Sequence, residues 1–126
     1  MERLKGKKKI EELFVSGSFV GAFPLRLVFI QTVDTNKLGV SVGKKNFKSA
    51  VIRNKVKRQL RVASKKHFLS LLKKLDNKYS IMVLYIGKEI PNPTALDEQF
   101  KLMVECFGKK LLDNEYINYE LSSFAK

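Results

Sequence analysis

The spacing of apolar residues changes several times along the chain, and each change predicts a different element. Helical spacing predicts a short amphipathic helix over Lys7–Val15 and a long helix from about Ala50 to Leu75. Runs rich in β-branched and large apolar residues predict strands over Leu25–Thr32 and Leu38–Val42. The nearly unbroken apolar run Ser80–Ile86 predicts a buried strand. Helices therefore alternate with strands along the chain.

Two further segments complete the predicted order. Phe19–Phe23 is a short extended stretch, and Pro91–Thr94 is a loop that begins a last helix with apolar residues at helical spacing. The pattern predicts one α+β domain over 1–126, with 113–126 as a tail of mixed character. We expect Leu25–Thr32 and Leu38–Val42 to pair as a hairpin. Leu38–Val42, the long helix and Ser80–Ile86 should form a β–α–β unit.

The faces of the predicted elements follow from the same periodicities. In the long helix one narrow apolar stripe is set against a broad cationic arc; the stripe consists of Ile52, Val56, Leu60, Ala63, His67 and Leu71. In the first long strand, alternation places Leu25, Leu27 and Phe29 on one face and Arg26, Val28 and Ile30 on the other.

Charge is concentrated in the middle third of the sequence. Lys and Arg number 25 against 12 Asp and Glu, which gives a net charge of +13. Residues 35–75 contain 13 basic and no acidic side chains, so this segment alone equals the whole excess. Unrelieved repulsion of this size indicates a surface that binds a polyanion, although a merely solvated helix face is the simpler alternative.

Several classes of protein are disfavoured by composition. One cysteine and one histidine exclude a disulfide framework and a Cys/His zinc site. No apolar run reaches the roughly 20 residues of a membrane span, and the basic start leads into no signal-peptide core, so we expect a cytoplasmic protein. No phosphate-binding glycine loop is present. We expect Cys106 to be a buried thiol rather than a nucleophile, and His67 to be packed rather than catalytic.

The basic segment has a spacing that suits RNA phosphates. Lys44 and Lys45 follow the end of a strand, and Arg53, Lys57 and Arg61 recur every four residues on one row of the helix. The neighbouring row contains Asn54 and Arg58, and the Asn54 amide offers a donor and an acceptor to a sugar or base.

This segment closely resembles the signature of the bacterial ribonuclease P protein family, where a strand ending in Lys-Lys precedes a helix with an Arg-Asn-Arg-x-Lys-Arg-x-x-Arg pattern. Here the motif reads Arg-Asn-Lys-Val-Lys-Arg-Gln-Leu-Arg over Arg53–Arg61. The likeness extends over about residues 3–112, including Arg3-Leu4-Lys5 and Ser16-Gly17-Ser18. Lys55 replaces the usual third arginine and lacks its bidentate fork.

The resemblance implies a fold, an activity and partners. The fold would be an α-β sandwich of three main helices and a small, mostly antiparallel sheet with a left-handed β-α-β crossover, the class of the second domain of ribosomal protein S5. The protein would bind the catalytic RNA of ribonuclease P and the 5′ leader of precursor tRNA, supporting Mg²⁺-dependent endonucleolytic removal of the leader. The RNA would perform the chemistry and hold most of the Mg²⁺, with no organic cofactor and no catalytic side chain. The protein itself would be a monomer, one per RNA, without contact to a membrane.

The resemblance also implies two sets of site residues. The RNA-binding set is Lys44, Lys45, Arg53, Asn54, Lys55, Lys57, Arg58, Arg61 and Lys65. The 5′ leader would lie in a cleft between the first helix and the sheet, lined by Ile10, Phe14, Leu27 and Phe29. Ile10 stands where the family often has an aromatic. Core packing remains an equal alternative for Phe14 and Phe29, and a slip of one residue in the strand would exchange its faces.

Three rival functions share parts of this pattern. Charge alone does not separate a ribonuclease P protein from a ribosomal or general RNA-binding module, whereas the motif favours the former. A DNA-binding domain would need more base-reading side chains than Asn54 provides. A membrane-surface protein would need a larger apolar face on the basic helix.

Overall fold

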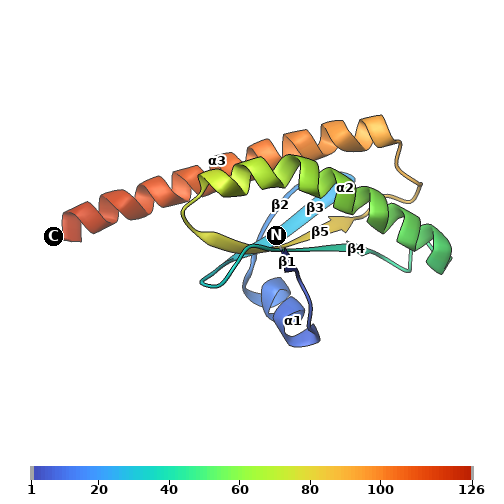
Figure 1. Cartoon of the computed structure of the whole chain (residues 1–126), viewed down its shortest axis with the longest axis horizontal. Helices are drawn as coiled ribbons and strands as arrows, with labels where there is room; N and C mark the ends of the chain where they lie inside the picture. The colour runs from blue at the N-terminus through green and yellow to red at the C-terminus, as the bar shows by residue number, and fades with distance from the viewer. Residues whose placement is uncertain (1, 126) are drawn as a thin grey trace.

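A computed structural model gives the fold of the chain (Figure 1). It describes the backbone of residues 2–125 and the side chains of residues 3–21 and 23–111. The elements are β1 (Glu2–Arg3), α1 (Lys7–Ser16), β2 (Ser18–Ala22), β3 (Leu25–Thr32), β4 (Lys37–Val42), α2 (Ala50–Lys74), β5 (Lys78–Tyr85) and α3 (Pro93–Ala125). Every predicted helix and strand is present, and the two-residue β1 is added. The predicted tail, 113–126, continues α3 as far as Ala125, and its side chains lie outside the described residues.

Strand β5 lies in the middle of a five-stranded sheet with the order β1-β4-β5-β3-β2. It pairs in parallel with β4 and antiparallel with β3. The outer pairs are parallel between β1 and β4 and antiparallel between β2 and β3. The predicted α+β class and the β–α–β unit formed by β4, α2 and β5 are confirmed, and the sheet is mixed.

The predicted hairpin between Leu25–Thr32 and Leu38–Val42 is wrong, because β5 lies between these two strands. Val83 of β5 faces Leu27 of β3 on one side and Val40 of β4 on the other. An apolar strand gains most when both its faces and both its edges are covered, which favours the central position. The short turn between β3 and β4 carries no information about a strand that enters the sheet much later in the chain.

The main core lies between one face of the sheet and helices α2 and α3, which run together over that face (Figure 1). At its centre the ring of Phe107 meets that of Phe29 edge to face, with centroids 4.7 Å apart. Phe107 also contacts Phe68 of α2 at 5.9 Å and Tyr79 of β5 at 6.2 Å. One side chain of α3 therefore packs against α2 and two strands, which fixes these layers relative to one another.

Helix α1 covers the opposite face of the sheet and closes a second, smaller core (Figure 1). Its buried side chains are Leu4, Leu13, Val28 and Met82. The faces predicted for β3 are thus confirmed: alternate residues enter the main core and the α1 core.

Gly17 brings the end of α1 close to β3. Its N–H donates to the Leu13 carbonyl at 2.8 Å and closes the helix. A Cβ at this position would clash with that carbonyl and lie 2.8 Å from Cγ2 of Val28 and 3.0 Å from the Phe29 carbonyl. Only a residue without a side chain permits this approach, and β2 begins immediately after it.

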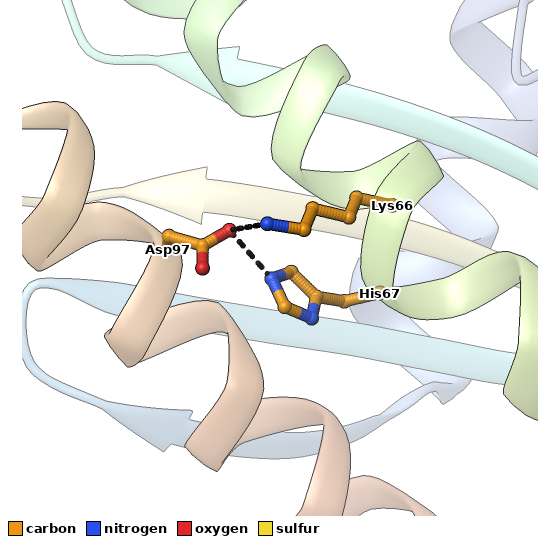
Figure 2. A network of polar contacts seen from close by, with 3 residues as sticks. All are labelled: Lys66, His67 and Asp97. Carbon is orange, nitrogen blue, oxygen red and sulfur yellow. Dashed lines mark hydrogen bonds and ion pairs between the residues drawn. The ribbon is translucent and has the colours of Figure 1, made fainter.

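A polar cluster joins α2 to the first turns of α3 (Figure 2). Oδ1 of Asp97 lies 3.2 Å from Nζ of Lys66 and 2.8 Å from Nε2 of His67. The imidazole also stacks on Phe100, with centroids 6.4 Å apart and planes at 15°. The expectation that His67 is a packed residue is therefore confirmed.

The prediction for Cys106 is wrong, because its thiol is exposed. Met103 and Phe107 are buried on the same helix, and Cys106 lies just beyond the edge of the stripe that they define.

Among the helices that the structure describes, none is long and apolar enough to cross a membrane.

We expect the contact between Asp97 and α2 to weaken in acid. Hydrogen bonds with His67 and Lys66 lower the pKa of Asp97 below its usual value. A lowered folded-state pKa adds stability above the unfolded-state value of about 3.9, and this stability is lost as the pH falls through the folded-state pKa. Asp97→Asn should therefore reduce the acid dependence of the urea midpoint, whereas Glu98→Gln, its neighbour in the chain, should not. An unchanged acid dependence in the Asp97 variant would contradict the contact.

Candidate nucleic-acid interface

Helix α2 buries one side and presents the other to solvent. Its buried side chains are Val56, Leu60, Ala63, Ser64, Phe68 and Leu72. The predicted stripe is confirmed over the first half of the helix, while Ile52 and Leu71 lie at its margin. In the second half the buried side turns toward α3, whose Phe100 and Phe107 pack on Phe68.

The predicted RNA-binding residues gather on the outer surface of α2 and on the turn that precedes it. The exposed members are Lys44, Lys45, Asn54, Lys55, Arg58 and Lys65, and the half-buried members are Arg53, Lys57 and Arg61. They lie within residues 44–65, on the turn and the helix that follows it, so that a single nucleic-acid strand could meet several of them. We call these nine residues the cationic surface.

No carboxylate forms an ion pair with this surface among the described side chains. Among the described side chains, the carboxylate contacts of residues 35–75 join Lys37 to Asp34 at 4.0 Å, Lys66 to Asp97 at 3.2 Å and His67 to Asp97 at 2.8 Å. No residue of the cationic surface takes part in them. Its charges are therefore left for water or for an anionic partner.

The start of α2 adds a favourable electrostatic field. Ser49 caps the helix by accepting a hydrogen bond from the Ile52 N–H at 3.4 Å, and the first turn contains no acidic residue. The helix dipole gives this end a partial positive charge. Lys44 and Lys45 lie just before it, so the turn and the helix start together attract phosphate.

Internal contacts hold the turn before α2 in place. Phe47 is buried and its ring stacks on Tyr85 of β5, with centroids 6.1 Å apart. The Asn46 amide nitrogen donates to the Ile86 carbonyl at 3.3 Å. Lys44 and Lys45 therefore extend from a turn that these contacts hold in place.

Arg53 also helps to hold this turn, a role that the sequence did not predict for it. Its Nη1 donates to the carbonyls of Phe47 at 2.7 Å and Lys48 at 2.9 Å. A guanidinium can make these bonds and still present its other N–H groups outward. Sequence periodicity placed Arg53 off the apolar stripe correctly, and the backbone carbonyls it meets could not be read from that pattern.

Two of the residues assigned to the leader cleft lie on the wrong face of the sheet. Leu27 is fully buried and Phe29 is 6% exposed, and both belong to the main core beneath α2 and α3. The cleft was expected beside α1, which covers the opposite face. The alternation along β3 was predicted correctly, and the error lay in which face meets α1.

The α1 side retains two of the expected cleft residues and adds two that were missed. Ile10 packs at the margin of the α1 core, and Phe14 is 39% exposed one turn later. Phe19 faces Val28 in the register of β2 and β3 and is 40% exposed. The Arg26 guanidinium lies 4.8 Å from the centre of the Phe19 ring. Pairing Phe19–Phe23 with Leu25–Thr32 as a hairpin would have found Phe19 and Arg26 from the sequence.

The described residues do not fit a metal ion held by protein side chains. Over the part of the chain whose side chains are described, no group of three or more His, Cys, Asp or Glu residues converges.

Comparison with known proteins assigns the family. The Ribonuclease P family model matches residues 1–109. The Ribonuclease P protein component of Porphyromonas gingivalis is 34% identical over 98 residues, which cover 72% of this chain and 72% of that protein. The chain belongs to the Ribonuclease P protein family.

Solved structures of Ribonuclease P proteins share the fold. The protein from Staphylococcus aureus superposes with a TM-score of 0.69 at 22% identity, covering 84% of this chain and 94% of that one. The protein from Thermotoga maritima gives a TM-score of 0.67 at 21% identity, covering 83% and 97%. These likenesses support the α+β arrangement of three helices and a mixed sheet.

Membership of the Ribonuclease P protein family implies a role in tRNA processing, within an endoribonuclease complex, in partnership with Ribonuclease P RNA. The resemblance carried by Arg53–Arg61 is thereby confirmed. A general RNA-binding module and a DNA-binding domain are no longer needed to explain the charge.

Arg53 and Arg61 should differ in their effect on stability. Hydrogen bonds to a charged group contribute about 1.5–3 kcal/mol, so Arg53→Ala should lower the free energy of unfolding by about that amount. Arg61→Ala should change it by about 0.5 kcal/mol or less. Urea unfolding of the two variants is the measurement, and equal stabilities would contradict the carbonyl contacts of Arg53.

Phe29 and Phe14 should separate in the same way. Removing a fully packed phenylalanine costs about 3–5 kcal/mol, which we expect for Phe29→Ala. Phe14→Ala, on the exposed flank of α1, should cost about 1 kcal/mol or less. A Phe29 variant as stable as the Phe14 variant would contradict the burial of Phe29 in the main core and favour its assignment to the leader cleft.

Proposed function

We propose that this protein is the RNA-binding subunit of a ribonuclease P that removes the 5′ leader of precursor tRNA. The observation that carries the proposal is the cationic surface, which is free of carboxylate partners among the described side chains and coincides with the family motif on α2. The catalytic RNA of the complex would lie against this surface.

The cationic surface would act by neutralising phosphates. Lysines and arginines that replace condensed counterions release them to the solution, and this release favours association at low salt. Arg58 and Arg61 offer planar donor groups that can grip a phosphate at two points, whereas Lys55 and Lys57 act as compact charges. Local relief of phosphate repulsion would help the RNA adopt its active fold at lower Mg²⁺.

Magnesium enters this proposal through the RNA. The described side chains offer no carboxylate cluster for the ion. The protein residues bind and position RNA, and the reacting groups would belong to the RNA.

The protein would act as a monomer, one copy per RNA.

The leader would follow the α1 side of the sheet. Phe14 and Phe19 expose aromatic surface there, and Arg26 adds a charge beside the Phe19 ring. Unpaired bases stack on aromatic side chains without regard to sequence, and a nearby guanidinium can meet their phosphates. The proposed leader set is Ile10, Phe14, Phe19 and Arg26, in which the last two replace Leu27 and Phe29.

The first test is reconstitution. The protein is added to Ribonuclease P RNA and precursor tRNA at low Mg²⁺, where the RNA alone is slow, and the mature 5′ end is quantified. We expect a clear gain in processing rate, which Lys57→Ala combined with Arg61→Ala should reduce and the exposed Lys101→Ala on α3 should not. Absence of any gain with wild-type protein would overturn the proposed function.

The leader assignment is tested by comparing two substrates. Phe14→Ala and Phe19→Ala should each weaken binding of precursor tRNA to the complex by about 1–3 kcal/mol for a lost base stack. Binding of mature tRNA, which has no leader, should stay unchanged. Val15→Ala, 85% exposed on the same helix, is the matched control. Equal losses for both tRNAs would refute the leader path.

A further inference from the structure

A groove with a volume of about 340 Å³ lies between α2 and the start of α3. Its walls are formed by Val62 and Ala63 on one side and by Pro93 and Leu96 on the other. Val62 is 66% exposed, and the residues across the groove from it, Pro93 and Leu96, are apolar. The molecule therefore leaves an apolar hollow open to solvent on the same helix that carries the cationic surface.

One residue that lines the groove has an unsatisfied hydrogen-bond acceptor. Gln59 lines it, and Oε1 of this residue is buried without a hydrogen-bond partner. A buried amide oxygen that lost its water without gaining a donor is unfavourable. A rotation of the Gln59 amide toward the groove would let this oxygen accept a hydrogen bond from a ligand N–H group.

Charged groups surround the opening. Arg58 lines the groove, and it also belongs to the cationic surface. Lys66 and Asp97 line it as well, and the carboxylate is held by Lys66 at 3.2 Å and by His67 at 2.8 Å. Arg58 has no ion pair among the described side chains and is the cation left to meet an anion at this opening.

We propose that this groove receives one unpaired nucleobase of the RNA bound to α2. A base has flat apolar faces for the walls formed by Val62 and Leu96, edge N–H groups for Gln59, and an attached phosphate for Arg58. An apolar side chain of a protein partner would fill the walls but would leave Gln59 and Arg58 without partners. The inference rests on the proposed function, because the nucleotide would belong to RNA already held by the cationic surface.

The direct test uses the free protein and two small probes. Adenosine 5′-monophosphate and ribose 5-phosphate carry the same phosphate, and only the former carries a base. In NMR titrations at millimolar concentration, we expect the monophosphate to shift the amide signals of Val62, Ala63 and Leu96, and ribose 5-phosphate to leave them unchanged. Equal shifts with both probes would indicate a phosphate contact alone and overturn the proposal, as would no shift with either.

A variant of Gln59 tests the hydrogen bond. Gln59→Leu removes an acceptor that has no partner in the free protein, so stability should be unchanged or higher. Binding of adenosine 5′-monophosphate should weaken several-fold. A residue with a merely structural role would show the reverse pattern, with lower stability and unchanged nucleotide binding.

A charge-adding variant separates base docking from simple electrostatics. Val62→Lys removes apolar wall while adding a cation to the RNA-binding helix, and Val51→Lys adds the same cation outside the groove, where Val51 is 79% exposed. We expect Val51→Lys to maintain or raise affinity for Ribonuclease P RNA and Val62→Lys to lower it about tenfold, or about 1.4 kcal/mol. Equal affinities of the two variants would overturn the groove proposal.

The groove proposal and the proposed function can be refuted independently. Reconstituted processing tests whether the protein serves Ribonuclease P RNA at all, and the probe titration requires no RNA. A protein that raises processing while its groove ignores the base refutes only the groove. A protein without effect on processing refutes the proposed function.

Discussion

The apolar run of β5 has to be shielded from water on both faces and along both edges. Ile81 and Val83 point into the main core, and Met82 between them points into the α1 core. Helices are therefore needed on both sides of the sheet, with α2 and α3 on one and α1 on the other. Because two helices share one face, α2 contributes only a narrow buried stripe, and the rest of its circumference is free to carry charge.

Placing thirteen cations in 41 residues without an acid would destabilise an isolated domain. The fold moderates the repulsion in several ways: Lys73 and Lys74 lie at the C-terminal end of α2, where the helix dipole favours them. Lys66 is paired with Asp97 across the helix interface. Many of the remaining charges are spread along a helix of 25 residues rather than gathered at one point. RNA would supply the missing counter-charge. Binding would therefore relieve the same repulsion between cations that the fold only partly offsets.

The sequence was informative wherever periodicity alone decides the outcome. The span of α2, its stripe around Val56 and Leu60, and the alternation along β3 all follow from local spacing. Three features depend on contacts between distant segments or with backbone groups and were therefore missed: the insertion of β5 between β3 and β4, the face of Phe29, and the carbonyl contacts of Arg53. The motif located the cationic surface correctly, yet it could not show which of its members also support the fold.

The close approach at Gly17 has a consequence for how the α1 side of the sheet would hold a flexible strand. Helix α1 ends against β3, and Gly17 alone separates it from β2, so α1 cannot swing away unless the pairing of β2 with β3 breaks. A binding surface built in this way is preorganised: it loses little conformational entropy on association, and nearly all the ordering falls on the nucleic acid. Such a surface would discriminate by rigidity, accepting single strands that can bend to its shape and rejecting stiff duplexes of the same charge.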